Sequence, residues 1–134
     1  MEKRIDSVLL VDDDKINNFI NERLIKKLSF ADNITVVTNG QEALDFINLK
    51  IKAQSALPEL ILLDINMPVM DGFEFIEQYR NIGEKGRTNI IVLTTSTNDK
   101  DLHRVSEAKE VSGFINKPLT EEKLKNAISQ LTFA

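Results

Sequence analysis

The chain has 134 residues, of which 42% are hydrophobic, and a formal net charge of −4. That length suits one compact domain with a real core, and the acidic balance argues against a general nucleic-acid-binding surface. Cysteine is absent, which excludes disulfides, thiolate metal sites and cysteine nucleophiles. The apolar run before Asp12 is too short for a signal peptide or a membrane span, so we expect a cytoplasmic protein without membrane contact.

The first half of the chain alternates strand-like and helical patterns. Segments 7–11 and 34–38 are short runs of apolar and β-branched residues, which predicts two strands. A helix is predicted after the first strand, over 15–28. One of its faces carries large apolar residues, as in a helix packed on a core: Ile16, Phe19, Ile20, Leu24 and Leu28. Asn39 is placed to cap a second helix that runs to about Ile51.

The second half continues the alternation. Three further strands are predicted, at 60–64, 89–94 and 113–116. A helix begins at Gly72, and its inward residues are expected to be Phe73, Ile76 and Tyr79. A weaker helix covers about 98–111, where the apolar side has only Leu102, Val105 and Ala108. Thr120 caps the last helix, which runs to about Leu131.

The strands indicate the fold class. The central ones are continuous apolar runs, which indicates that both of their faces are covered, as in a parallel sheet between two layers of helices. We therefore expect an α/β, doubly wound, five-stranded parallel sheet with helices on both faces. Ligands of such sheets bind beyond the carboxyl ends of the strands, where the strand order reverses.

Polar groups follow four of these strands: Asp12-Asp13-Asp14, Asp64, Thr94-Thr95-Ser96 and Asn116-Lys117-Pro118. Each group alone has an ordinary explanation as a helix cap, a loop residue or a solvated charge. Together they are harder to dismiss, because acids gathered at one sheet edge repel each other and a divalent cation relieves that repulsion. A lysine and a hydroxyl after the neighbouring strands would face these acids and complete a binding site for a phosphoryl group, with an aspartate as the nucleophile.

Four stretches occur in order, VLLVDDD, LLDINMPVMDG, VLTTS and GFINKP. With them the chain resembles, from Val8 to about Leu131, the receiver domain of bacterial two-component response regulators, the family of the chemotaxis protein CheY. The resemblance implies a single receiver domain over 1–134 with no output domain, and the flavodoxin-like strand order 2-1-3-4-5. It also implies no enzyme activity beyond accepting a phosphoryl group and losing it again.

The resemblance further implies a role for each residue at the sheet edge. Asp64 matches the phosphoacceptor of the family. Mg²⁺, for which Mn²⁺ or Ca²⁺ could substitute, would bind Asp12, Asp13, Asp64 and the backbone carbonyl of Asn66. Thr94 matches the hydroxyl that moves to the phosphoryl group.

Three positions near the end of the chain complete the implied switch. Lys117 matches the lysine that binds a phosphoryl oxygen, and the Lys117–Pro118 bond is expected to be cis. Phe114 matches the aromatic switch residue, although many members have Tyr there. Thr95 stands where the family usually has Ala or Gly, which we expect to modulate access to the site. Asn66 and Ser96 occupy the positions that tune the lifetime of the phosphoryl group.

The implied partners are proteins. The phosphodonor would be a sensor histidine kinase or a histidine phosphotransfer protein, and a downstream target would bind helix 98–111, strand 113–116 and the last helix. A phosphorylation-dependent dimer is compatible with the same surface, and no direct contact with nucleic acid is implied.

Other interpretations remain open. A phosphohydrolase of the haloacid dehalogenase type also uses an aspartate after a strand, but Lys15-Ile16 does not continue its motif. A pseudo-receiver keeps the fold without phosphorylation, but such proteins typically lose an acid or the lysine. A flavin- or nucleotide-binding flavodoxin-like domain would need a phosphate-cradling loop after the first strand, where this chain has DDDK.

Overall fold

The computed structural model describes residues 5–82, 88–95 and 98–131. Five parallel strands form one sheet in the order β2-β1-β3-β4-β5. The strands are β1 (Ile5–Val11), β2 (Ala31–Val37), β3 (Leu60–Asp64), β4 (Asn89–Thr94) and β5 (Val111–Asn116). The predicted flavodoxin-like order is therefore confirmed.

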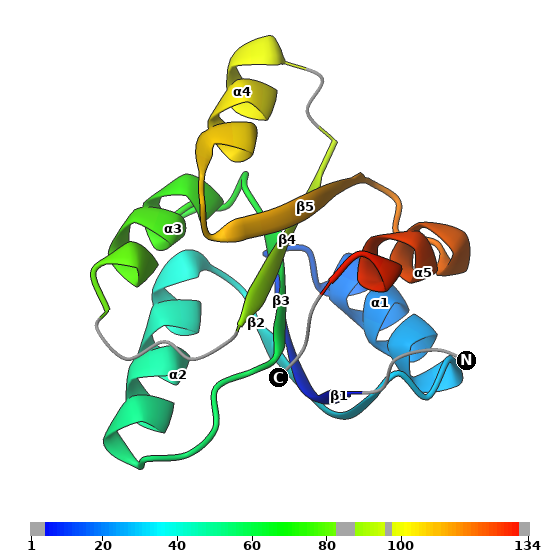
Figure 1. Cartoon of the computed structure of the whole chain (residues 1–134), viewed down its shortest axis with the longest axis horizontal. Helices are drawn as coiled ribbons and strands as arrows, with labels where there is room; N and C mark the ends of the chain where they lie inside the picture. Colours follow the sequence, from blue (N-terminus) through cyan, green and yellow to red (C-terminus); the bar gives the residue numbers. More distant parts are fainter. Residues whose placement is uncertain (1–4, 83–87, 96–97, 132–134) are drawn as a thin grey trace.

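A helix follows each strand: α1 (Lys15–Lys27), α2 (Gly40–Lys52), α3 (Gly72–Arg80), α4 (Asp99–Glu107) and α5 (Glu121–Ser129). Helices α1 and α5 cover one face of the sheet, and α2, α3 and α4 cover the other (Figure 1). None of the helices in the described ranges is both long and apolar enough to cross a membrane.

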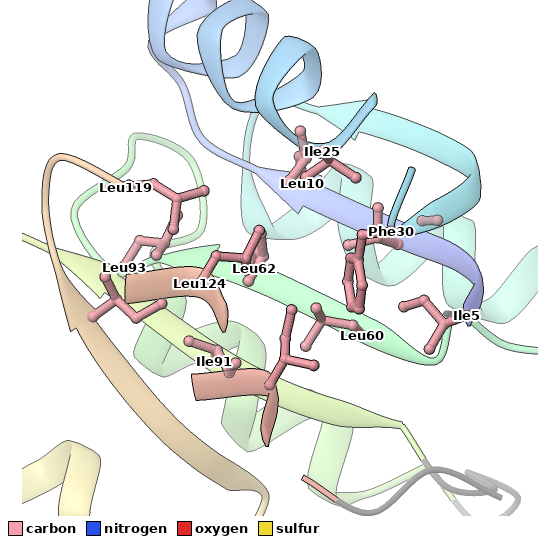
Figure 2. Close-up of a cluster of buried hydrophobic side chains, with 14 of the residues drawn as sticks. Ile5, Leu10, Ile25, Phe30, Leu60, Leu62, Ile91, Leu93, Leu119 and Leu124 are labelled. Carbon is pink, nitrogen blue, oxygen red and sulfur yellow. The ribbon is translucent and has the colours of Figure 1, made fainter. Parts of the chain in front are cut away.

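The core is divided by the sheet. All five residues of β3 are buried, because successive side chains enter the layers on opposite faces. Figure 2 shows the layer under α1 and α5, where Ile25 of α1 lies beside Leu10 of β1 and Leu124 of α5 lies near Leu62 of β3. Burying β3 on both faces holds its end rigidly, which matters because Asp64 stands there.

Side-chain caps begin the helices within a few residues of the strand ends. Asp14 accepts hydrogen bonds from the backbone N–H groups of Ile16 and Asn17, and Thr120 caps α5 as predicted. Asp71 and Glu74 form a reciprocal capping box at the start of α3. The caps of α1 and α5 thus follow closely on the ends of β1 and β5.

Helix α1 is rotated relative to the prediction. Ile16, Phe19 and Ile20 are 70%, 59% and 54% exposed, whereas the buried residues are Asn18, Asn21 and Ile25. The apolar face was recognised, but its orientation was wrong for the first half of the helix. Helical periodicity identifies an apolar face without saying whether that face points to the sheet. Here the side chain of Asn18 donates to the carbonyl of Asp12 at the end of β1, which is consistent with the observed rotation of α1 against the sheet.

Three smaller differences concern the second half of the chain. Phe75 is fully buried and stacks on Tyr79, with ring centroids 5.7 Å apart, whereas Phe73, expected to point inward, is only partly buried. The weak helix is shorter than predicted, because α4 ends at Glu107 and the chain is extended by Ala108. Strand β5 therefore begins at Val111, two residues before the predicted strand.

Candidate functional site

Three carboxylates meet at the carboxyl edge of the sheet. Strands β1 and β3 are paired in parallel, with Val11 opposite Leu63, so Asp12 and Asp64 follow side by side. One carboxylate oxygen from each of Asp12, Asp13 and Asp64 lies within 4.8 Å of the others. Asp12 and Asp64 are buried and Asp13 is exposed, so the cluster is open to solvent on one side.

Lys117 reaches this cluster from the end of β5. Its Nζ lies 2.8 Å from Oδ2 of Asp12 and 3.5 Å from Oδ2 of Asp64. Its backbone N–H donates to the carbonyl of Thr94, 2.9 Å away, and the Lys117–Pro118 peptide bond is cis. The lysine is therefore anchored through its main chain while its ammonium group balances two buried acids.

Asp12 is held at four points, the first being its backbone N–H, which donates to the carbonyl of Val37 at 3.2 Å. Its Oδ1 accepts from the backbone N–H of Asp14 at 2.9 Å, and its Oδ2 accepts from Lys117. Its carbonyl accepts a 2.7 Å hydrogen bond from the Asn18 side chain. Asn18 was not anticipated from the sequence, where nothing distinguishes it from an asparagine on the surface of an amphipathic helix.

The pKa values of Asp64 and Lys117 are both raised, which favours the neutral form of the acid and the charged form of the lysine. Burial raises the pKa of Asp64, the positive charge of Lys117 counteracts this, and the negative charge of Asp12 adds to the rise. Burial acts to lower the pKa of Lys117, but its hydrogen bond to Asp12 and the charge of Asp64 outweigh burial and raise it. The site thus holds a firmly charged lysine and an aspartate that is costly to ionise.

Replacing Asp64 by asparagine is expected to stabilise the unphosphorylated protein at pH 7. Because the pKa of this acid is raised on folding, its ionisation destabilises the fold above that pKa, and the penalty disappears as the pH falls below its ordinary value. Since the site opens to solvent, we expect a gain of about 1 kcal/mol, or about 3 °C in Tm. Thermal melts between pH 4 and pH 8 measure it.

Asp45→Asn is the matched control, because Asp45 is exposed on α2 and its carboxylate accepts a hydrogen bond from the side chain of Gln41. Its Tm should change little over the same pH range. A variant at position 64 that is no more stable than the natural protein at pH 8 would contradict the assigned cost of ionising this carboxylate.

The remaining predicted site residues lie around the same edge. Thr94 is fully buried at the end of β4, and Thr95 is exposed next to it. Asn66 is exposed in the loop after β3, and its backbone N–H donates to Oδ1 of Asp64 at 3.3 Å. Phe114 is 48% exposed on β5. Ser96 lies outside the described residues.

The donor set suits a hard divalent cation. Three carboxylates supply oxygen atoms close enough to share one ion, and the side open at Asp13 leaves room for water ligands. Mg²⁺, Mn²⁺ and Ca²⁺ all prefer such oxygen ligands, whereas the sequence offers no thiolate and only one histidine.

A five-stranded doubly wound sheet with acids and a lysine at its carboxyl edge is the architecture of CheY-like signalling domains. Residues 8–129 match the family model of the response regulator receiver domain. The chain belongs to this family, as the sequence markers implied, and it is therefore a signalling domain of two-component systems.

Relatives and solved structures agree with this membership. The chain is 32% identical to a probable methanogenesis regulatory protein, FilR2, of Methanothrix harundinacea, over 92% of this chain and 79% of the relative. A two-component response regulator from Cytophaga hutchinsonii superimposes with a TM-score of 0.85 and 32% identity, over 96% of this chain and 97% of that one. The Mn²⁺-bound form of the response regulator Rcp1 superimposes with a TM-score of 0.76 and 26% identity, over 96% and 99% of the two chains.

Proposed function

We propose that this receiver domain is a cytoplasmic phosphorylation switch that accepts a phosphoryl group on Asp64 from a sensor histidine kinase or a histidine phosphotransfer protein. The observation that carries the proposal is the position of Asp64. It stands at the rigid end of a strand buried on both faces, with Asp12 and Asp13 beside it and the ammonium group of Lys117 at 3.5 Å.

In the proposed reaction, an oxygen of Asp64 attacks the phosphorus of a phosphohistidine. The new O–P bond forms as the N–P bond breaks. The electron pair of the broken N–P bond stays on the imidazole nitrogen, which takes up a proton. Lys117 and the hydroxyl of Thr94 hold the phosphoryl oxygens. Charge neutralisation and positioning therefore provide most of the acceleration of phosphoryl transfer. Water later cleaves the acyl phosphate, which resets the domain without making it an enzyme in the ordinary sense.

Asp12, Asp13, Asp64 and the carbonyl of Asn66 would hold the divalent cation. When bound, Mg²⁺ supplies positive charge that offsets the repulsion between the acids and the incoming phosphoryl group. The likeness to a regulator described as Mn²⁺-bound is consistent with this assignment.

The resting contacts of Lys117 suggest how phosphorylation would be sensed. Its Nζ is closer to Asp12, at 2.8 Å, than to Asp64, at 3.5 Å. A phosphoryl group on Asp64 would add negative oxygens that compete for this lysine and for Thr94. Their movement would shift the half-exposed Phe114 and the α4-β5-α5 surface, to which a downstream protein or a second copy of the domain would bind.

The exposed face of α1 supports a protein as the phosphodonor. Ile16, Phe19 and Ile20 lie on the first turns of the helix that follows the acids of β1, and each is more than half exposed. A donor protein that brings an imidazole to Asp64 must cover the surroundings of the sheet edge, and apolar side chains there favour its binding.

The proposal is tested with acetyl phosphate and Mg²⁺ by intact-mass analysis. One phosphoryl group, stable to acid and labile to base, should appear on the natural protein and on Asp45→Asn, and none on Asp64→Asn. Asp13→Asn should need more Mg²⁺ for the same yield. An unmodified natural protein would favour a pseudo-receiver, and steady turnover of an organic phosphate would favour a phosphohydrolase.

A further inference from the structure

Helix α4 is attached to the body of the domain by few buried side chains. Val105 is its single buried residue, and its first turn carries the two acids Asp99 and Asp101. The contact between Nε2 of His103 and Oε1 of Glu107, at 3.2 Å, lies on the exposed surface of the helix itself. A helix anchored in this way can move at a small cost in free energy.

A second attachment joins α4 to α3. The guanidinium carbon of Arg104 lies 3.8 Å from the centroid of the Phe73 ring, in the first turn of α3. At this distance the cation stacks on the ring face. The stack therefore links two helices that are separated in the sequence by strand β4.

Phe73 belongs to a small hydrophobic cluster apart from the two main core layers. The cluster contains the buried residues Ile65, Val92 and Val105, with Phe73 and Val111 packed against it. Ile65 directly follows Asp64, and Val105 is the buried anchor of α4. A continuous set of packed side chains thus connects the phosphoacceptor strand with the helix expected to move.

The space beside this stack is loosely filled. A groove of about 250 Å³ lies between α3 and α4, lined by Phe73, Ile76, Glu77, Arg80, Arg104, Glu107 and Ala108. Close packing would resist a shift of α4, whereas an open groove leaves room for it. Contacts that cross the groove, such as this stack and the ion pair of Arg80 with Glu110 just after α4, therefore help to hold α4 in position.

We propose that the Arg104–Phe73 stack is a latch that holds α4 in its resting position, and that α4 must release it to reach the phosphorylated arrangement. This inference rests on the proposed function, because it assigns the resting state of the same switch. Removing the latch should raise the population of the active arrangement before any phosphorylation, and a conformation that favours phosphorylation then reacts faster.

The test compares Arg104→Ala with Arg23→Ala in two measurements. Arg23 is the matched control because it also lies over a phenylalanine, Phe19, at 5.6 Å, but within helix α1. Loss of the Arg104 stack should speed hydrogen exchange of residues 99–107 in the unphosphorylated protein, and phosphorylation by acetyl phosphate and Mg²⁺, each by about two- to fivefold. Arg23→Ala should change neither.

Two further variants separate the stack from the charge. Arg104→Lys keeps the charge without the planar group and should give a smaller increase than Arg104→Ala. Phe73→Leu keeps an apolar side chain in the cluster, and adding it to Arg104→Ala should produce little further change, because the two residues form one contact.

The latch proposal is overturned if the amides of α4 exchange no faster in Arg104→Ala than in the control variant Arg23→Ala. Faster exchange with an unchanged phosphorylation rate would also overturn it, since α4 would then be loosened without coupling to Asp64. A natural protein that accepts no phosphoryl group would defeat the proposed function instead, and the exchange measurement would still report on the latch alone.

Discussion

Replacing Lys117 by alanine is expected to lower the free energy of unfolding by about 2 kcal/mol and to slow phosphorylation of Asp64 about 100-fold. The ammonium group contacts two buried carboxylates, at 2.8 and 3.5 Å, and its removal leaves them facing each other. We expect a smaller loss of stability than for breaking a fully buried ion pair, because the cluster is open to solvent at Asp13.

Urea denaturation and thermal melts measure the loss of stability, which corresponds to about 7 °C in Tm. The pKa of Lys117 is raised on folding, so its contribution to stability is complete at neutral pH and is lost only as the pH rises through the raised value. The difference between the natural protein and the variant should therefore persist from pH 7 to the ordinary lysine range and shrink above it.

Lys123→Ala is the control for this experiment. The Nζ of Lys123 donates to the carbonyls of Asn116 and Pro118, at 2.9 and 3.2 Å, so this lysine supports the same loop without contacting the acids. Its removal should cost about 1 kcal/mol and leave the phosphorylation rate within a few-fold of the natural protein. Equal effects of the two substitutions on that rate would refute the role assigned to Lys117.

Substituting Gly72 by alanine is expected to destabilise the fold by about 3 kcal/mol and to impair phosphorylation as well. A Cβ at this position would lie 2.6 Å from the carbonyl oxygen of Asp64 and 2.7 Å from Cα of Ile65. Both are main-chain atoms at the end of β3, so relief of the clash requires the start of α3 to move away from the strand end that presents the nucleophile, or the strand end itself to move.

Gly113→Ala provides the comparison, because a Cβ there meets nothing within 4 Å. Gly113 lies in β5, where alanine restricts the unfolded chain more than glycine does, so this variant should be as stable as the natural protein or gain up to about 1 kcal/mol. Denaturant titration of both variants measures the contrast. If Gly72→Ala were as stable as Gly113→Ala, the start of α3 would be free to move away from Asp64.

Much of the fold followed from local patterns. Continuous apolar runs predicted the strands, and Asp14, Asn39 and Thr120 were recognisable as caps because a helix start needs a side-chain acceptor next to its first N–H groups. The candidate site could be predicted because parallel strands end at one edge, and because the resemblance to receiver domains implied a strand order that places Asp12 beside Asp64.

Tertiary structure alone decided which faces and partners those elements took. The exposure of Ile16, the burial of Phe75 and the stack of Arg104 on Phe73 depend on how each helix rotates against a sheet built from distant segments. The sequence by itself determined the parallel α/β class and the polar residues that follow its strands, since these rest on short-range patterns, and its motifs, through the family they resemble, gave the strand order. It did not determine side-chain orientation or pairing, because these are set by the summed packing of many long-range contacts that no local period encodes.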